Sequence, residues 1–232
     1  MRRTRAFALV PAVLTGTLVA CSPTVSSEYA STGPVERQFT RGGTVHMDLS
    51  AGQYLISGTE SDRLRVRWSA ENPEDAKQAK VVVDVKDSTA RIVTDGPSNN
   101  FRVEIEMPAR SHIILRLSAG EVRVNGIEGN KDISAWAGEV TVGVPDASQY
   151  GKVSASLTAG EIRAEAFDEK REGVFPSFNW QGKGSYELST RLTAGQINFR
   201  DEGSPAEQEE ATPPEEQKPD APPAEQKEPG GA

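Results

Sequence analysis

Sulfur and imidazole groups are scarce in this chain of 232 residues, which has one cysteine and two histidines. A lone Cys21 excludes an internal disulfide framework. His46 and His112 each lie in an alternating segment with no second ligand at metal-binding spacing, so the sequence indicates no metal site. The G-x-S-x-G elbow, the H-E-x-x-H helix and the phosphate-binding glycine loop are also missing. We therefore expect a protein that is not an enzyme.

An excess of positive charge is missing as well. The formal net charge is −8 at pH 7, although Arg2, Arg3 and Arg5 add positive charge at the N-terminus. Nucleic acid is therefore a poor candidate partner. After residue 200 the chain is rich in glutamate, glutamine and proline and has no aromatic residue. Such a segment buries too little apolar surface to fold, so we predict a disordered acidic tail over residues 201–232.

No apolar run is long enough to cross a bilayer. Residues 6–20 are uncharged and mostly apolar, but a membrane-spanning helix needs about 20 apolar residues. A basic start, a short apolar stretch and small residues before a cleavage point are typical of an export signal. We therefore predict a signal peptide over residues 1–20.

The end of this signal carries a recognisable motif. Leu18, Val19, Ala20 and Cys21 resemble the lipobox of bacterial lipoproteins. The resemblance implies that the first three are the recognition residues and that Cys21 receives diacylglycerol on its thiol and an acyl chain on its new amine. These lipids would anchor the protein to a membrane of the cell envelope. Because Ser22 stands where inner-membrane retention usually needs aspartate, the resemblance implies the outer membrane in a Gram-negative host. The alternative is an ordinary secretory signal followed by a buried cysteine.

Between the two ends the sequence has the pattern of a β domain. Residues 21–40 are polar with scattered proline, serine and glycine, and predict a flexible tether. Polar and apolar residues alternate in segments such as 63–68 and 101–107, which indicates strands. One helix is predicted after Asn72, a good N-cap that is followed by proline and two acidic residues. Residues 41–200 are therefore predicted to form one all-β domain.

A short motif recurs five times in this domain. Each copy has alanine and glycine, then glutamate or glutamine, then alternating apolar residues; its glycines are Gly52, Gly120, Gly138, Gly160 and Gly195. Glycine permits a tight corner, and alanine permits close approach of adjacent coils. The repeats predict a β-solenoid, with residues 43–107 as an antiparallel cap or flanking sheet. A β-sandwich with glycine-rich turns is the alternative.

These corners carry a second resemblance, to the putative adhesin or Toastrack-type β-strand-repeat domains of bacteria. It rests on the corners, on residues 126–129 after one strand and on a strand that ends at Met107 and Pro108, and it covers roughly residues 40–200. The resemblance implies a right-handed single-stranded solenoid, an envelope location and a binding or scaffolding role, with no active site. The long interval between Gly160 and Gly195 predicts a large loop.

Two groups of residues are candidates for a site. Glu121, Glu139 and Glu161 follow three of the corners. If the corners align, these carboxylates either bind a hard cation or raise one another's pKa; the alternative is an exposed ladder balanced by Arg123 and Arg163. We favour the ladder, because calcium needs six or more oxygen ligands.

The second group is the densest aromatic cluster, which contains Phe175, Phe178 and Trp180. These side chains either form a binding surface or plug the open end of the fold. We favour the plug, because exposed aromatic patches are uncommon on soluble domains.

Three functions fit these observations. The first is a membrane-anchored envelope lipoprotein whose non-catalytic repeat domain serves adhesion, binding or scaffolding, with an envelope protein or a glycan as partner. The second is an accessory or sensor subunit of an envelope-stress or transport system. The third is a glycan-active β-helix enzyme, which is disfavoured because the acidic residues form no distinctive pair.

Overall fold

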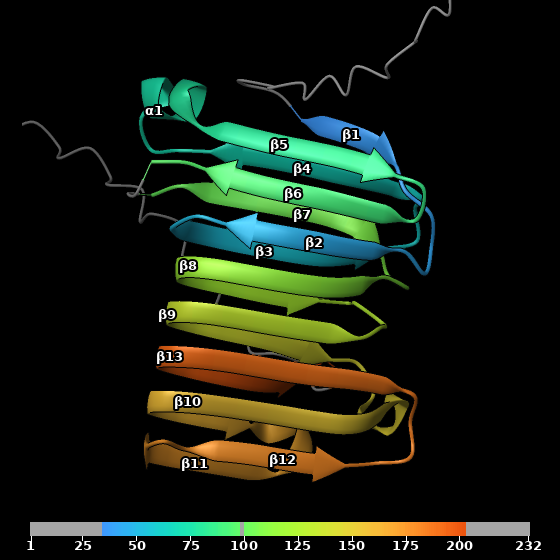
Figure 1. Ribbon diagram of the computed structural model, residues 1–232, viewed down its shortest axis with the longest axis vertical. Coiled ribbons are helices and arrows are strands. Elements are labelled where there is room, and N and C mark those ends of the chain that lie inside the picture. The colour runs from blue at the N-terminus through green and yellow to red at the C-terminus, as the bar shows by residue number, and fades with distance from the viewer. Residues whose placement is uncertain (1–33, 98–99, 203–232) are drawn as a thin grey trace, which may run out of the picture.

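A computed structural model describes residues 34–97 and 100–202 of the chain. These residues form an all-β domain, as predicted (Figure 1). The shorter strands are β1 (Val35–Gln38), β2 (Thr44–Leu49), β3 (Gly52–Thr59), β4 (Arg63–Ser69), β5 (Lys80–Lys86), β6 (Thr89–Asp95), β7 (Arg102–Pro108), β11 (Glu169–Val174) and β12 (Ser177–Gln181). The longer strands, which bend, are β8 (His112–Asn125), β9 (Lys131–Val144), β10 (Tyr150–Ala164) and β13 (Tyr186–Asp201).

Helices contribute little to the domain. The predicted helix is confirmed as α1 (Pro73–Gln78), and the Asn72 side chain accepts a hydrogen bond from the Glu74 amide at 3.0 Å. Two single turns, η1 (Ala147–Gln149) and η2 (Glu165–Phe167), flank β10. In the described part of the chain, none of the helices is both long enough and apolar enough for a membrane span.

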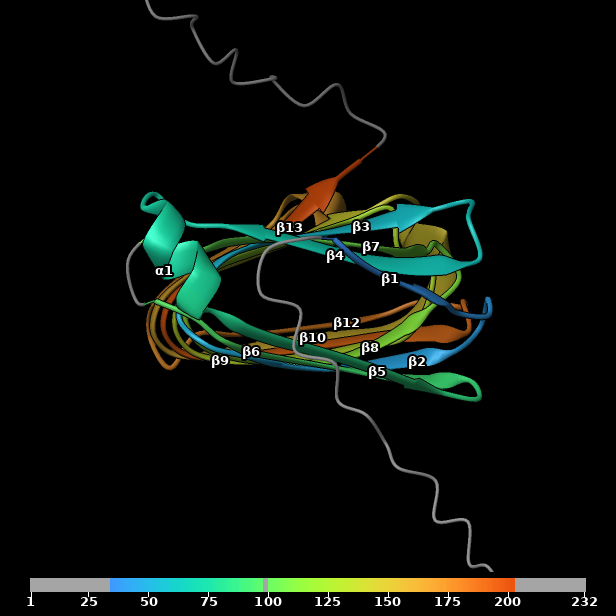
Figure 2. The same cartoon turned by 90° about the horizontal axis from the view of Figure 1, so that it is seen from above.

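The strands make two facing layers, which Figure 2 shows from above. We call the layer formed by the arms before the corners the first sheet; its order is β5-β6-β2-β8-β9-β13-β10-β12. The arms after the corners form the second sheet, in the order β1-β4-β7-β3-β8-β9-β13-β10-β11. Each long strand belongs to both sheets. Alternate apolar side chains point between the layers and form one core.

The order of the strands in space differs from their order in the chain. The β6 and β7 strands lie outside β2 and β3, and β13 lies between β9 and β10 with parallel pairing on both sides. A strict solenoid would stack each coil on the one before it, so the solenoid stays a prediction, as does its hand. The antiparallel cap predicted over residues 43–107 is confirmed only in part. In that range β4 and β5 pair antiparallel with their neighbours, whereas β2, β3, β6 and β7 have parallel partners and continue the two sheets; β1, from outside the range, adds a further antiparallel strand.

The predicted corner glycines stack in one column. In space the order is Gly52, Gly120, Gly138, Gly195 and Gly160, and each member is paired in register with the next; Gly173, which was not predicted, pairs with Gly160 and ends the column. A Cβ atom added to Gly138 would lie 1.8 Å from the carbonyl oxygen of Gly120, and one on Gly195 would lie 1.8 Å from that of Gly138. Both glycines also have a positive φ, of 124° and 131°. Only glycine satisfies both conditions, so the column fixes where each long strand bends.

The large loop predicted between Gly160 and Gly195 is wrong. This stretch contains β11 and β12, which pair antiparallel with the two arms of β10 and close the end of the stack. The strands form because apolar Phe178 points inward from β12 and packs on Phe167 and Phe199, with ring centroids 5.7 and 6.1 Å away. Burial of these rings makes the stretch part of the core.

The domain boundaries also need correction. The predicted tether ends before residue 35, because Val35 is buried and β1 pairs with β4. At the other end β13 continues to Asp201, and the Glu202 carboxylate accepts a hydrogen bond from the Gly126 backbone amide at 2.8 Å. The predicted signal, the lipobox with Cys21, Ser22 and the rest of the acidic tail lie outside the described residues.

Candidate functional site

The three predicted carboxylates lie on the outer surface of the second sheet, one residue after the glycine column. Register pairs Glu121 with Glu139, but Gln196 lies between Glu139 and Glu161 because β13 is inserted there. The three carboxylates therefore share a column, and only two of them are direct neighbours.

Each of these carboxylates accepts hydrogen bonds from neighbouring side chains. Arg123 donates to Glu121 at 2.5 Å, and Arg163 donates to Glu161 at 2.8 Å. Arg163, followed by Lys170, lowers the pKa of Glu161 to about 2. Glu139 accepts hydrogen bonds from the Asn198 amide and the Thr141 hydroxyl at 2.7 and 3.1 Å. Residues 34–97 and 100–202 contain no group of three or more His, Cys, Asp or Glu side chains that could hold a metal ion. The column is a ladder in which Arg123 and Arg163 pair with Glu121 and Glu161, as the favoured interpretation expected, but its carboxylates are half-buried and not exposed.

The predicted aromatic residues separate into two kinds. Phe178 is 4% exposed, and Trp180 packs on Phe167 with 4.9 Å between ring centroids, so both belong to the plug. Phe175 is different, since its side chain is 73% exposed. Its φ is 55°, in the left-handed region that bulky residues avoid at a cost of about 1–3 kcal/mol. Because the Phe175 side chain is exposed, no burial in the core compensates for the strain of its backbone.

A second exposed aromatic residue, Trp136, is not among the predicted site residues. It lies on β9 directly before Ala137 and Gly138, and its side chain is 70% exposed. The signal for it is present in the sequence, because Ile133 and Ala135 point inward and the alternation places Trp136 on the outside. Tryptophan side chains are mostly buried in folded proteins, so one at an outward position is a candidate for a binding surface.

Trp136 and Phe175 belong to one line of residues along the bend. Ala137 pairs with Ala194 and Ala194 pairs with Ala159, so the residues just before these alanines are also neighbours in space. The Phe175 amide donates to the Thr158 carbonyl oxygen at 2.8 Å and extends the line. We call this line the corner row; in spatial order it contains Trp136, Thr193, Thr158 and Phe175.

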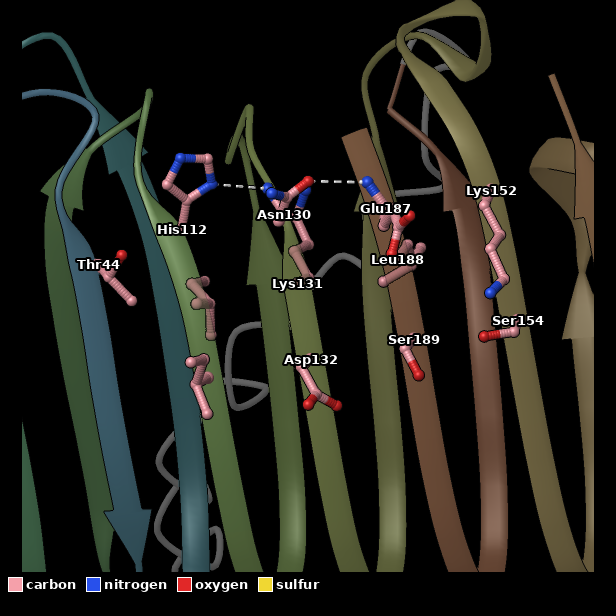
Figure 3. Close-up of a pocket in the computed structure, with 12 residues that line it drawn as sticks. Thr44, His112, Asn130, Lys131, Asp132, Lys152, Ser154, Glu187, Leu188 and Ser189 are labelled. Atoms are coloured by element: carbon pink, nitrogen blue, oxygen red, sulfur yellow. Dashed lines mark hydrogen bonds between the residues drawn. The ribbon is translucent and has the colours of Figure 1, made fainter. Parts of the chain in front are cut away.

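Beside the corner row, the outer surface of the first sheet carries several serines together with a few charged side chains. Register places Ser134, Arg191, Ser156 and Ser177 side by side, and then Asp132, Ser189, Ser154 and Asn179. We call this surface of β9, β13, β10 and β12 the serine face. Figure 3 shows Asp132, Ser189 and Ser154 in a row across three strands. Hydrogen bonding between the strands holds these groups in a fixed array, with about 4.8 Å between strands.

The serine face is hollowed at the edge opposite the corner row (Figure 3). The hollow has a volume of about 520 Å³ and polar walls that include Lys152, Glu187 and Asn130. Asn130 is held in place by two hydrogen bonds. Its backbone amide donates to His112 Nδ1 at 3.0 Å, and its side-chain Oδ1 accepts a hydrogen bond from the backbone amide of Glu187 at 2.8 Å. The hollow therefore combines polar walls with an apolar lining from Ile113, Ile114 and Leu188.

Charges on the serine face compensate one another. Arg191 donates to the Asp132 carboxylate at 2.6 Å. Lys152 and Glu187 are opposite each other in the register of β10 and β13. The face therefore carries equal numbers of these positive and negative groups and has no net preference for an ion.

Beneath the hollow lies a buried lysine that the sequence analysis missed. Lys131 is 1% exposed, and its ammonium donates to the Tyr150 hydroxyl at 2.6 Å and to the Gly129 carbonyl oxygen at 3.2 Å. Burial lowers the pKa of Lys131 to about 8 and raises the pKa of Tyr150 above its usual value. The only sequence signal is a lysine at an inward position of a strand.

Comparison with known proteins gives limited similarity. No protein-family model matches the chain, and no curated protein matches it significantly in sequence. Among solved structures, a putative cell adhesion protein from Clostridium sporogenes is similar, with a TM-score of 0.46, 17% identity, and coverage of 73% of this chain and 99% of that one. A putative adhesin from Bacteroides fragilis has a TM-score of 0.23, 10% identity, and coverage of 72% and 96%. At these identities neither structure assigns a ligand to this chain.

Proposed function

We propose that this protein is a non-catalytic binding module of the cell envelope, used for adhesion, and that the serine face with its corner row is its binding surface. One observation carries the proposal: Trp136 and Phe175 are both exposed on the same row, beside a polar sheet surface. Aromatic side chains with polar neighbours are the usual anchors of binding surfaces.

The exposure of Trp136 and Phe175 contributes nothing to the stability of the fold. Apolar side chains of this size gain about 1.5–3 kcal/mol when they are buried, and neither Trp136 nor Phe175 makes that gain. The backbone of Phe175 is also strained. Strained residues are candidates for contact with a partner.

The glycine column suits this role, because it makes the surface rigid. Four strands that cross both sheets are locked at one bend, so the serine face cannot slide relative to the second sheet. A rigid surface loses little conformational entropy on binding. In this proposal the stacked corners work as a β-solenoid does, with the corner row as one of its long edges.

The proposal includes the lipid anchor on Cys21. Residues 22–33 separate the anchor from the described domain and, when fully extended, reach about 40 Å from the membrane. Ser22 favours the outer membrane where the host has two membranes. Anchoring on this tether would leave the serine face accessible to other components of the envelope.

Fractionation of cells that express Cys21→Ser tests the anchoring. We expect the wild-type chain in the membrane fraction, labelled by a clickable fatty acid, and the variant in the soluble fraction without label. Cys21→Ser protein that stays in the membrane fraction would exclude the lipid anchor. Protease treatment of intact cells then determines on which side of the membrane the domain lies.

Substitution on the serine face tests the binding surface. In a cell-adhesion assay, Trp136→Ala should reduce attachment, whereas Leu55→Ala should not. Leu55 is a matched control, because it is also an exposed apolar residue but lies on the second sheet. Equal attachment by both variants and the wild type would refute the assignment of this surface.

A further inference from the structure

We infer that the serine face binds an uncharged polysaccharide, with Trp136 and Phe175 stacked on its sugar rings. This inference rests on the proposed function and specifies the class of ligand. The evidence is the spacing of the aromatic residues, the chemistry of the groups around them and the balance of charge on the face.

The spacing fits an extended chain better than a single small molecule. Three strand intervals separate Trp136 from Phe175, which corresponds to about 14 Å. Thr193 and Thr158 lie between them on the corner row. An aromatic ring at each end and hydroxyl groups between them match a run of several linked sugars, which present apolar ring faces and hydroxyl edges in turn.

The groups beside the corner row match sugar hydroxyls. Serine hydroxyls and the Asn179 amide both donate and accept hydrogen bonds, as the ligand's hydroxyl groups do. In the described part of the chain, no hydrogen bond from another side chain engages the hydroxyls of Ser154 and Ser156. These groups remain available for a ligand at fixed positions on the sheet.

The charge on the face favours a neutral ligand. Asp132 and Arg191 neutralise each other directly, and Lys152 lies across from Glu187. An acidic polymer would need an unpaired cluster of arginine or lysine residues. The array of hydroxyls likewise disfavours insertion into a lipid surface, because buried polar groups without partners cost free energy.

Binding to defined polysaccharides tests the inference. The full mature chain with Cys21→Ser is incubated with insoluble cellulose, chitin and a β-glucan as neutral probes, with alginate beads as an acidic probe and with phosphatidylcholine vesicles as a lipid probe. We expect binding to at least one neutral polysaccharide. Trp136→Ala and Phe175→Ala should each weaken that binding at least tenfold, and Leu55→Ala should leave it unchanged. Circular dichroism confirms that the variants are folded.

Three results would overturn the inference: no binding to a neutral probe, binding that Trp136→Ala leaves unchanged, or stronger binding to alginate or vesicles through the same residues. A photo-crosslinker at Ser156 in living cells separates this failure from failure of the proposed function. A crosslink to a protein would refute the inference that the ligand is a polysaccharide and would still support the serine face as the binding surface. Release of new reducing ends from the polysaccharide would refute the non-catalytic role instead.

Discussion

Replacement of Gly195 by alanine should destabilise the domain strongly, because this glycine is enclosed in the middle of the column. The new Cβ would lie 1.8 Å from the Gly138 carbonyl oxygen and 3.1 Å from its amide nitrogen, so β13 and β9 would have to separate. The φ of 131° adds backbone strain of about 1–3 kcal/mol. Hydrogen bonds lost between the two strands add about 0.5–1.5 kcal/mol each.

With two such bonds lost, these effects predict a loss of roughly 2–6 kcal/mol, centred near 4 kcal/mol, in the free energy of unfolding, out of the 5–15 kcal/mol typical of a domain. For a domain of this size the loss lowers the Tm by about 8–16 °C. Urea and thermal denaturation followed by circular dichroism measure both quantities. The expected result is a clear fall in the denaturant midpoint with an unchanged slope.

Gly173→Ala is the matched control for this variant. Gly173 has a φ of 117° and pairs with Gly160 at the end of the column, but a Cβ added there meets no atom within 4 Å. This control therefore has the backbone strain without the steric clash. If Gly195→Ala and Gly173→Ala unfold within about 1 kcal/mol of each other, the close stacking of the glycine corners is wrong.

Three further predictions concern single side chains. Phe178→Ala should cost about 3–5 kcal/mol in chemical denaturation, whereas Phe175→Ala should change stability by less than about 0.5 kcal/mol; equal losses would refute the division between plug and surface. Between pH 8 and pH 10 the unfolded chain retains a proton on Lys131 that the folded chain has released, so stability should rise with pH, by roughly 2–3 kcal/mol at most. Lys131→Met should abolish that rise, and a rise that persists would contradict the assignment. Glu161 stabilises the fold above its unfolded pKa of 4.5, and this contribution is lost as the pH falls toward 2. Glu161→Gln should therefore flatten the decline of Tm in that range, and an unaltered decline would exclude the ion pair as its cause.

Local patterns in the sequence were sufficient to predict the all-β class and the positions of the corners. The alternation of apolar residues sets which faces are buried, and the repeated alanine–glycine pair identifies the bends, since Gly120 and Gly138 need positive φ. The helix after Asn72 follows from its N-cap and proline. In each case neighbouring residues in the chain determine the structure.

The position of β13 could not be predicted in this way. Its corner at Gly195 resembles the other corners equally, so the sequence does not tell which neighbours it joins. The insertion separates Glu139 from Glu161, which the sequence analysis could not anticipate. For the same reason the corner row was missed, because it joins Trp136 to Phe175 across strands that are distant in the chain.

Hydroxyl-radical footprinting of the protein in intact cell envelopes tests the central claim most directly. If the serine face is the binding surface, oxidation of Trp136 and Phe175 should be several-fold slower in the envelope than in the purified mature chain. Oxidation of Leu55 should be the same in both. Protection of Leu55 with full oxidation of Trp136 would place the partner on the second sheet and contradict the assignment.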